Sequence, residues 1–231
     1  MTGPIALAAD LLATWWELWL VVVVGLLAAA LAPAVIAATS ATRRPTPTER
    51  DHLVAAGVPP ERVRVVAAGD AAAAFAAGIS PRFGRVFLTT GLCETLAPES
   101  VAAVARHEYG HLRRRHVPLR LAVPVVFAVS WVAAARLAPG TGFLVGLALL
   151  VPTVAVSVAL ARWTEHDADR FAARVTGGER LAAALATLSA DGHLADGGRF
   201  SWHPALADRI ARLDADADGR HEFESRHAGD D

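Results

Sequence analysis

The chain has 231 residues, of which 54% are hydrophobic and 19% charged, with 22 basic against 23 acidic side chains and a formal net charge of −1. A hydrophobic share above the ~45–50% of ordinary soluble domains argues against a purely soluble protein and predicts contact with a lipid bilayer. The near-zero net charge argues against nucleic acid as a partner, and the single cysteine, Cys93, excludes an intrachain disulfide.

The first element is an uncharged apolar run, Trp19–Ala38, which predicts a transmembrane helix. About 20 residues of helix cross the ~30 Å hydrocarbon core, and tryptophans gather at its start as they do at a membrane interface. A cleaved signal peptide is the competing interpretation, but the preceding residues include Asp10 and Glu17 and no arginine. We therefore expect an uncleaved N-terminal anchor over residues 1–41.

Residues 42–117 have the composition of an extramembrane domain and begin with a Pro/Thr-rich linker. The β-branched and aromatic stretch Arg85–Thr90, bounded by glycines, predicts a strand. At a sheet edge this strand would receive an extended peptide by strand addition, whereas inside a sheet it would be a core strand. A helix is expected from Pro98 to Arg115, where apolar residues recur at helical spacing.

Two further apolar runs, Leu119–Leu137 and Phe143–Ala161, predict a transmembrane hairpin over residues 118–161. The turn-forming segment Ala138–Gly142 separates them. Arg136 interrupts the first run, so its side chain must reach the interface. The alternative is a pair of buried core helices, because both runs are slightly short for a bilayer.

Residues 162–213 are expected to be extramembrane, with one helix from Arg162 and a second around Leu206–Leu213, and residues 214–231 have the composition of a solvated or disordered tail. Arginines gather on one side of the predicted spans, which by the positive-inside rule predicts a multi-pass protein of the cell membrane with its extramembrane parts in the cytoplasm. Those on the cytoplasmic side are Arg43, Arg44, Arg113, Arg114, Arg115, Arg120 and Arg162, against Arg136 on the other.

The pattern that indicates chemistry is His107-Glu108-Tyr109-Gly110-His111, an H-E-x-x-H within a predicted helix. Positions four apart share a helix face, so both imidazoles can reach one zinc ion while Glu108 lies beside its open coordination position. Imidazole ligands without thiolate favour zinc among the first-row metals. The alternative is two surface histidines that bind no metal.

Two histidines need a third ligand, and the hairpin predicts where it lies. Position 138, at the start of the predicted turn, is halfway between His111 and Glu165. Each leg then has about 27 residues, or about 40 Å of helix, which returns Glu165 to the level of His111. We therefore predict Glu165 as the third ligand, with His166 as its competitor although it points about 100° away on the helix.

The segment that contains Glu165 also carries a carboxylate that can hold a metal-binding histidine in place. Asp169 lies one turn beyond Glu165 on the same face, where its carboxylate can accept the free N–H of a ligating imidazole, while Asp167 is expected to face solvent. One zinc held by two histidines and a glutamate lowers the pKa of a bound water towards ~7 and polarises a carbonyl. Glu108 would take the proton of that water and deliver it to the leaving amine, which predicts a peptide hydrolase without a covalent intermediate.

Several short segments also match a known family in type and order. They are Ala74–Gly78, Thr89–Leu92, His107–His111, Glu165–Asp169 followed by Arg170 and Phe171, and Trp202-His203-Pro204 leading to Arg209-Ile210. In these features the chain, from about Ala72 to Leu213, resembles the HtpX and CAAX prenyl protease group of membrane gluzincin metallopeptidases.

The resemblance implies a mainly α-helical, zincin-like membrane protein with a small β-sheet and about three transmembrane helices. It implies that His107, His111 and Glu165 bind zinc and that Glu108 is the catalytic base. It also implies a cytoplasmic active site that cleaves unfolded or membrane-associated proteins, as in membrane protein quality control. His203 and Arg209 either stabilise an oxyanion or, respectively, shape a turn and form a structural ion pair.

Two other functions remain open at the level of sequence. One is a BlaR-type antirepressor peptidase, a signalling protein with a zinc site beside membrane helices. The other is a membrane adaptor that keeps the fold and binds peptides without cleaving them, although binding alone does not need a general base such as Glu108.

Overall fold

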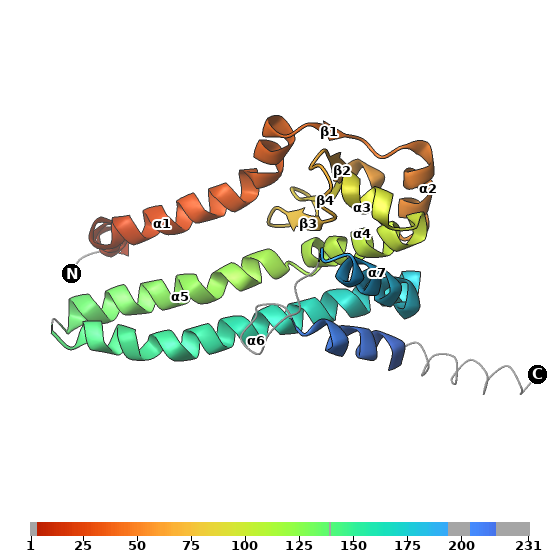
Figure 1. The fold of residues 1–231 in the computed structure, drawn as a ribbon. Helices are drawn as coiled ribbons and strands as arrows, with labels where there is room; N and C mark the ends of the chain where they lie inside the picture. Colours follow the sequence, from red (N-terminus) through yellow and green to blue (C-terminus); the bar gives the residue numbers. More distant parts are fainter. Residues whose placement is uncertain (1–3, 139, 194–203, 216–231) are drawn as a thin grey trace, which may run out of the picture.

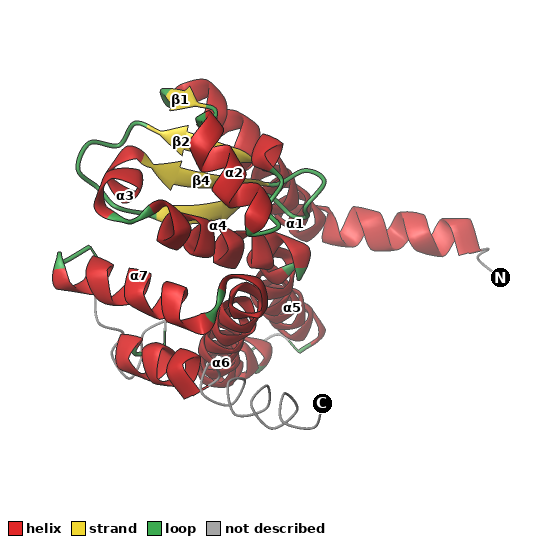
Figure 2. Ribbon diagram, turned by 90° about the vertical axis from the view of Figure 1, so that its right-hand side faces the viewer, coloured by secondary structure: helices red, strands yellow, loops and turns green. Residues whose placement is uncertain are grey.

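The computed structural model describes residues 4–138, 140–193 and 204–215, and it is mainly helical with a small four-stranded sheet, as predicted (Figures 1 and 2). His203, the segment 194–202 and most of the predicted tail lie outside the described residues. The elements are α1 (Pro4–Thr39), β1 (Thr42–Arg43), α2 (Pro47–Ala55), the 3₁₀ turn η1 (Pro60–Arg62), β2 (Val63–Val66), β3 (Ala74–Ala77), β4 (Arg85–Thr89), α3 (Thr90–Thr95), α4 (Pro98–Arg113), α5 (His116–Leu137), α6 (Gly142–Thr176) and α7 (Gly178–Ala190), followed by helix over 206–215.

Among the described residues, three helices are long and apolar enough to cross a membrane, namely the Val22–Thr39 part of α1, α5 and α6. Helices α5 and α6 lie side by side and project away from the sheet (Figure 1). In the most apolar stretch of each, 0% and 6% of the residues are buried. The alternative of two buried core helices is therefore wrong, because these helices expose their apolar side chains as a lipid-facing pair does.

The hairpin forms where the sequence predicts its turn, with α5 ending at Leu137 and α6 beginning at Gly142. Trp131 of α5 packs directly against Gly146 of α6, at a point where any side chain would clash with the indole. Close approach at a small residue is a usual way for membrane helices to pack. Helix α6 then continues to Thr176, so the second predicted span and the helix expected from Arg162 form a single helix.

The sheet has the strand order β1-β2-β4-β3. The predicted strand appears as β4, which pairs with β2 in parallel and with β3 in antiparallel fashion. Strand β4 is therefore an inner strand, so of the two alternatives for this segment the core strand is confirmed and the peptide-receiving edge strand is excluded. The edge strands are β1 and β3, and β3 is an alanine-rich strand that β-propensity does not reveal.

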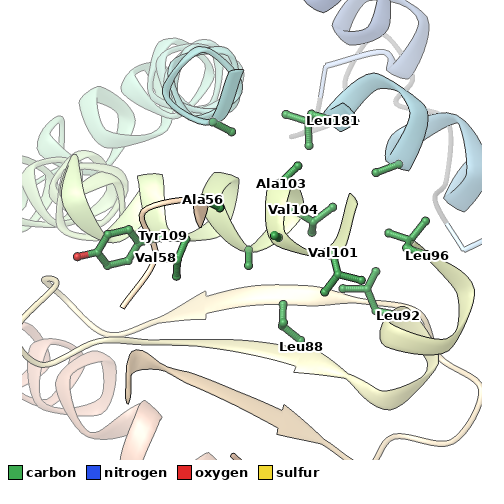
Figure 3. Close-up of a cluster of buried hydrophobic side chains, with 14 of the residues drawn as sticks. Ala56, Val58, Leu88, Leu92, Leu96, Val101, Ala103, Val104, Tyr109 and Leu181 are labelled. Carbon is green, nitrogen blue, oxygen red and sulfur yellow. The ribbon is translucent and has the colours of Figure 1, made fainter. Parts of the chain in front are cut away.

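Helix α4 lies across one face of the sheet and buries its apolar side against it (Figure 3). Val101 and Val104 of α4 and Leu88 of β4 belong to this core, and Leu181 of α7 closes it from the other side. Burying each such side chain contributes roughly 1.5–3 kcal/mol. The core thus fixes α4, and with it the H-E-x-x-H segment, between the sheet and α6.

Candidate metal centre

Helix α4 presents two histidines side by side one turn apart. His107 and His111 are 5% and 8% exposed, and their Nε2 atoms lie 3.2 Å apart. The rings meet edge to face with centroids 4.9 Å apart. The spacing of four residues on a helix thus places the two Nε2 atoms close enough to bind the same metal ion, as predicted from the sequence.

Helix α6 brings Glu165 to the same point. Its Oε2 lies 3.5 Å from Nε2 of His107 and its Oε1 lies 3.5 Å from Nε2 of His111. Gly110 permits the approach, because a Cβ there would lie 3.0 Å from the ring of Phe171 and 3.5 Å from Cα of Ala168 on α6. Glu165 thus lies beside His111, as the hairpin predicts. The assumption of one continuous helix from His111 into the membrane is wrong, because α4 ends at Arg113 and α5 begins at His116 after a turn.

The three side chains have the spacing that a tetrahedral metal requires. Two ligand atoms about 2.0–2.1 Å from a tetrahedral zinc lie about 3.3 Å from each other. The two Nε2 atoms lie 3.2 Å apart, close to this value, and each lies 3.5 Å from a different oxygen of Glu165. One ligand atom from each of the three residues lies within 4.8 Å of the other two. Two imidazoles and a carboxylate are also a donor set that suits zinc.

Electrostatics favour a cation at this point. Burial opposes charge on His107, but Asp169 and Glu165 raise the pKa of His107 to about 10. Burial and the neighbouring His107 lower the pKa of His111 to about 2. The two carboxylates thus stabilise positive charge among the imidazoles, which is what a bound divalent metal also needs.

Asp169 supports His107 from behind, as the sequence predicts. Its Oδ1 lies 2.8 Å from Nδ1 of His107. Arg209 donates to both oxygens of Asp169, at 2.8 and 2.6 Å, and its Nη1 lies 3.6 Å from Oε2 of Glu165. Arg209 is 8% exposed. Of the two interpretations of Arg209, these contacts favour the buried structural ion pair.

Sequence reasoning missed Arg120 as part of the site. This side chain of α5 donates to the hydroxyl of Thr164, to the carbonyl of Ala161 at 3.1 Å and to Oε1 of Glu165 at 2.8 Å. Glu165 is therefore held between two arginines, Arg120 and Arg209. A signal was present, because a charged residue at the start of an apolar span needs a partner.

Asp167 was misjudged, and its partner His116 was missed. Asp167 is 9% exposed and accepts from Nε2 of His116 at 3.1 Å, so the prediction that it faces solvent is wrong. Nε of Arg114, in the turn between α4 and α5, also lies 3.7 Å from Oδ2 of Asp167. His166, the competing third ligand, is partly buried and lines a cavity that Asp169 and Arg209 also line, on the far side of these residues from the histidine pair.

Glu108 lies next to the two histidines and is directed towards the sheet. Partial burial raises its pKa to about 7, while a hydrogen bond from the backbone amide of Ala76 opposes the rise. Ala76 belongs to β3, so the carboxylate lies between the histidine pair and the edge strand.

Comparisons with known proteins agree with this geometry. Residues 46–217 match the profile of peptidase family M48. The "Protease HtpX homolog" of Paraburkholderia phytofirmans is 29% identical over 203 residues, covering 71% of this chain and 70% of that protein. The protein of the same name from Burkholderia multivorans is 27% identical over 202 residues, with the same coverage.

The fold also matches a solved structure, the crystal structure of S. mikatae Ste24p. The TM-score is 0.66 at 18% sequence identity, and the match covers 86% of this chain. The chain spans 57% of the length of Ste24p. Taken with the family profile, the histidine pair and the carboxylate beside it, the likeness shows that this chain belongs to peptidase family M48 and is an HtpX-like metalloprotease with membrane helices.

Proposed function

We propose that the chain is a membrane-bound, zinc-dependent endopeptidase in which His107, His111 and Glu165 hold one zinc ion. The observation that carries this proposal is the convergence of two imidazole nitrogens 3.2 Å apart and one buried carboxylate, with one ligand atom of each residue within 4.8 Å of the others. A zinc ion bound there would supply an activated water and polarise the carbonyl of the scissile bond. The remaining chemistry belongs to side chains of this chain.

Glu108 is the general base in this proposal. A carboxylate with a pKa near neutrality can take a proton from the attacking water and return it to the leaving amine. The amide of Ala76 fixes the position of the carboxylate beside the two histidines. An adaptor that only binds peptides has no use for a base held in this place.

The edge of β3 is the proposed binding site for the substrate backbone. The amide of Thr89 donates to the carbonyl of Ala73, so Phe75 and Ala77 form the hydrogen-bonded pairs with β4. The amides and carbonyls of Ala74 and Ala76 consequently point away from β4. The amide of Ala76 donates to Glu108, and the amide and carbonyl of Ala74 and the carbonyl of Ala76 face the open side. An extended peptide paired there would pass the metal centre, and such pairing accepts many sequences.

The proposed substrates are unfolded or membrane-associated proteins, and the proposed site faces the cytoplasm of the cell membrane. Recognition through the peptide backbone suits a protease that clears damaged membrane proteins. Three candidate membrane helices and the arginine asymmetry around them support this placement.

Replacement of Glu108 tests the proposal. We expect detergent-purified Glu108→Gln to keep its zinc and to cleave casein about 10²–10⁴-fold more slowly than the wild type, because it lacks the base. Glu99→Gln, an exposed change on the same helix, is the control and should cleave like the wild type. Unchanged cleavage by Glu108→Gln would remove the assigned mechanism, and zinc binding without any cleavage by the wild type would favour the adaptor.

A further inference from the structure

The turn between α4 and α5 folds a third histidine back onto the metal centre. Arg115 has a φ of 57°, the left-handed conformation that costs a non-glycine residue about 1–2 kcal/mol. The turn places His116, at the start of α5, under His111, with Nδ1 of one ring 2.9 Å from Nδ1 of the other. His116 is 1% exposed. A buried imidazole in contact with a proposed metal ligand can influence how that ligand binds the metal.

The other nitrogen of His116 meets a carboxylate from α6. Nε2 lies 3.1 Å from Oδ2 of Asp167. Two arginines surround this carboxylate, with Nε of Arg114 at 3.7 Å and Nη2 of Arg170 at 4.0 Å. The ring of Trp163 covers His116 edge-on with centroids 5.9 Å apart. Asp167, His116 and His111 thus form a continuous, enclosed chain of contacts.

The hydrogen positions along this chain follow from the partners. An ionised Asp167 only accepts, so Nε2 of a neutral His116 carries the hydrogen and Nδ1 keeps its lone pair. Nδ1 of His111 must then donate to Nδ1 of His116. In that tautomer Nε2 of His111 has its lone pair directed at His107 and Glu165, where a metal ligand needs it.

We propose that His116 and Asp167 form a relay that fixes the tautomer and orientation of His111 as a metal ligand. Both are positioning residues and neither touches the substrate. This relay is the counterpart of Asp169, which supports His107 on the other side of the site. Partners of this kind strengthen a ligand, and their loss typically weakens metal affinity 10–100-fold. The inference rests on the proposed zinc site.

Zinc affinity tests the relay without relying on turnover. Zinc binding by the full chain in detergent is measured by chelator competition, and the visible spectrum of the Co²⁺-substituted protein reports ligand geometry. His116→Phe and Asp167→Leu should weaken zinc binding by about 10–100-fold and change the Co²⁺ spectrum. Asp167→Asn keeps an oxygen acceptor and should lose less.

His166→Phe is the matched control, because it removes an imidazole from the same level of α6 without touching the relay, and it should bind zinc like the wild type. If His116→Phe does not fold, the comparison of Asp167→Leu with Asp167→Asn decides. Folded relay variants with wild-type zinc affinity and spectrum would overturn the relay and leave the proposed function intact. A wild type that binds no zinc would overturn both.

Discussion

At the scale of single residues, the site is a buried group of charged side chains in which each charge is stabilised by an opposite charge beside it. Glu165 lies between Arg120 and Arg209, and Arg209 also holds Asp169 through two hydrogen bonds. A charge left unpaired in such a place is costly, so each member depends on the others. This coupling sets the expected effect of removing one of them.

Replacement of Arg209 by methionine removes both guanidinium hydrogen bonds to the buried carboxylate of Asp169 and leaves it with His107 alone among these partners. We expect Arg209→Met to lower the free energy of unfolding by about 3–5 kcal/mol. Arg209→Lys should be intermediate, since an ammonium group cannot form the bidentate contact. Thermal unfolding in detergent checks both, with the exposed Arg212→Met as control. Equal stability of Arg209→Met and Arg212→Met would show that the ion pair contributes nothing.

At the scale of elements, short helices outside the membrane depend on their ends. Helix α2 begins with a capping box in which Thr46 and Glu49 satisfy each other's backbone amides, and Arg43 pairs with Glu49 at 2.7 Å. The hydrogen bond from Arg43 is the main reason that the pKa of Glu49 falls to about 2. Folding therefore favours the ionised carboxylate.

This pKa gives stability a defined pH dependence. Because the pKa of Glu49 is lower in the folded than in the unfolded chain, its contribution is present above about pH 4.5 and is lost as pH falls towards 2. Glu49→Gln should reduce stability by about 1 kcal/mol at neutral pH and by less at pH 3. Urea unfolding at both pH values, with exposed Glu61→Gln as control, tests this. A pH-independent difference would contradict it.

Elements with a strong local signal were predictable from the sequence. The H-E-x-x-H helix, strand β4 and the hairpin follow from spacing and hydropathy, and the hairpin alone located Glu165. Helix α7 and strand β3 were missed, because alanine-rich segments fit several structures and only packing selects one. The roles of Arg120, His116 and Asp167 depend on partners 44 to 51 residues away, which no local pattern records.

At the scale of the whole molecule, one continuous helix joins the membrane to the site. Helix α6 begins at the far end of the hairpin and carries Glu165 and Asp169 near its other end, so the position of the site relative to the membrane is fixed by helix length. The division of the chain at residues 41, 117, 161 and 213 remains a prediction. The orientation of the chain in the membrane can be tested directly.

Cysteine labelling in intact cells tests the orientation. In a Cys93→Ala background, Thr141→Cys at the hairpin turn should react with a membrane-impermeant maleimide from outside. Thr48→Cys, beside the start of α2, should react only after permeabilisation, because the arginine-rich side remains in the cytoplasm. The opposite labelling pattern would reverse the proposed orientation.

In the proposed site Glu165 completes the zinc ligands with His107 and His111, and the zinc content of the purified chain decides whether it does. We expect about one zinc per wild-type chain and almost none in Glu165→Gln, while His166→Phe retains it, each measured on protein whose helical content is unchanged. A Glu165→Gln protein that binds zinc as tightly as the wild type, or a wild type without zinc, would contradict the account.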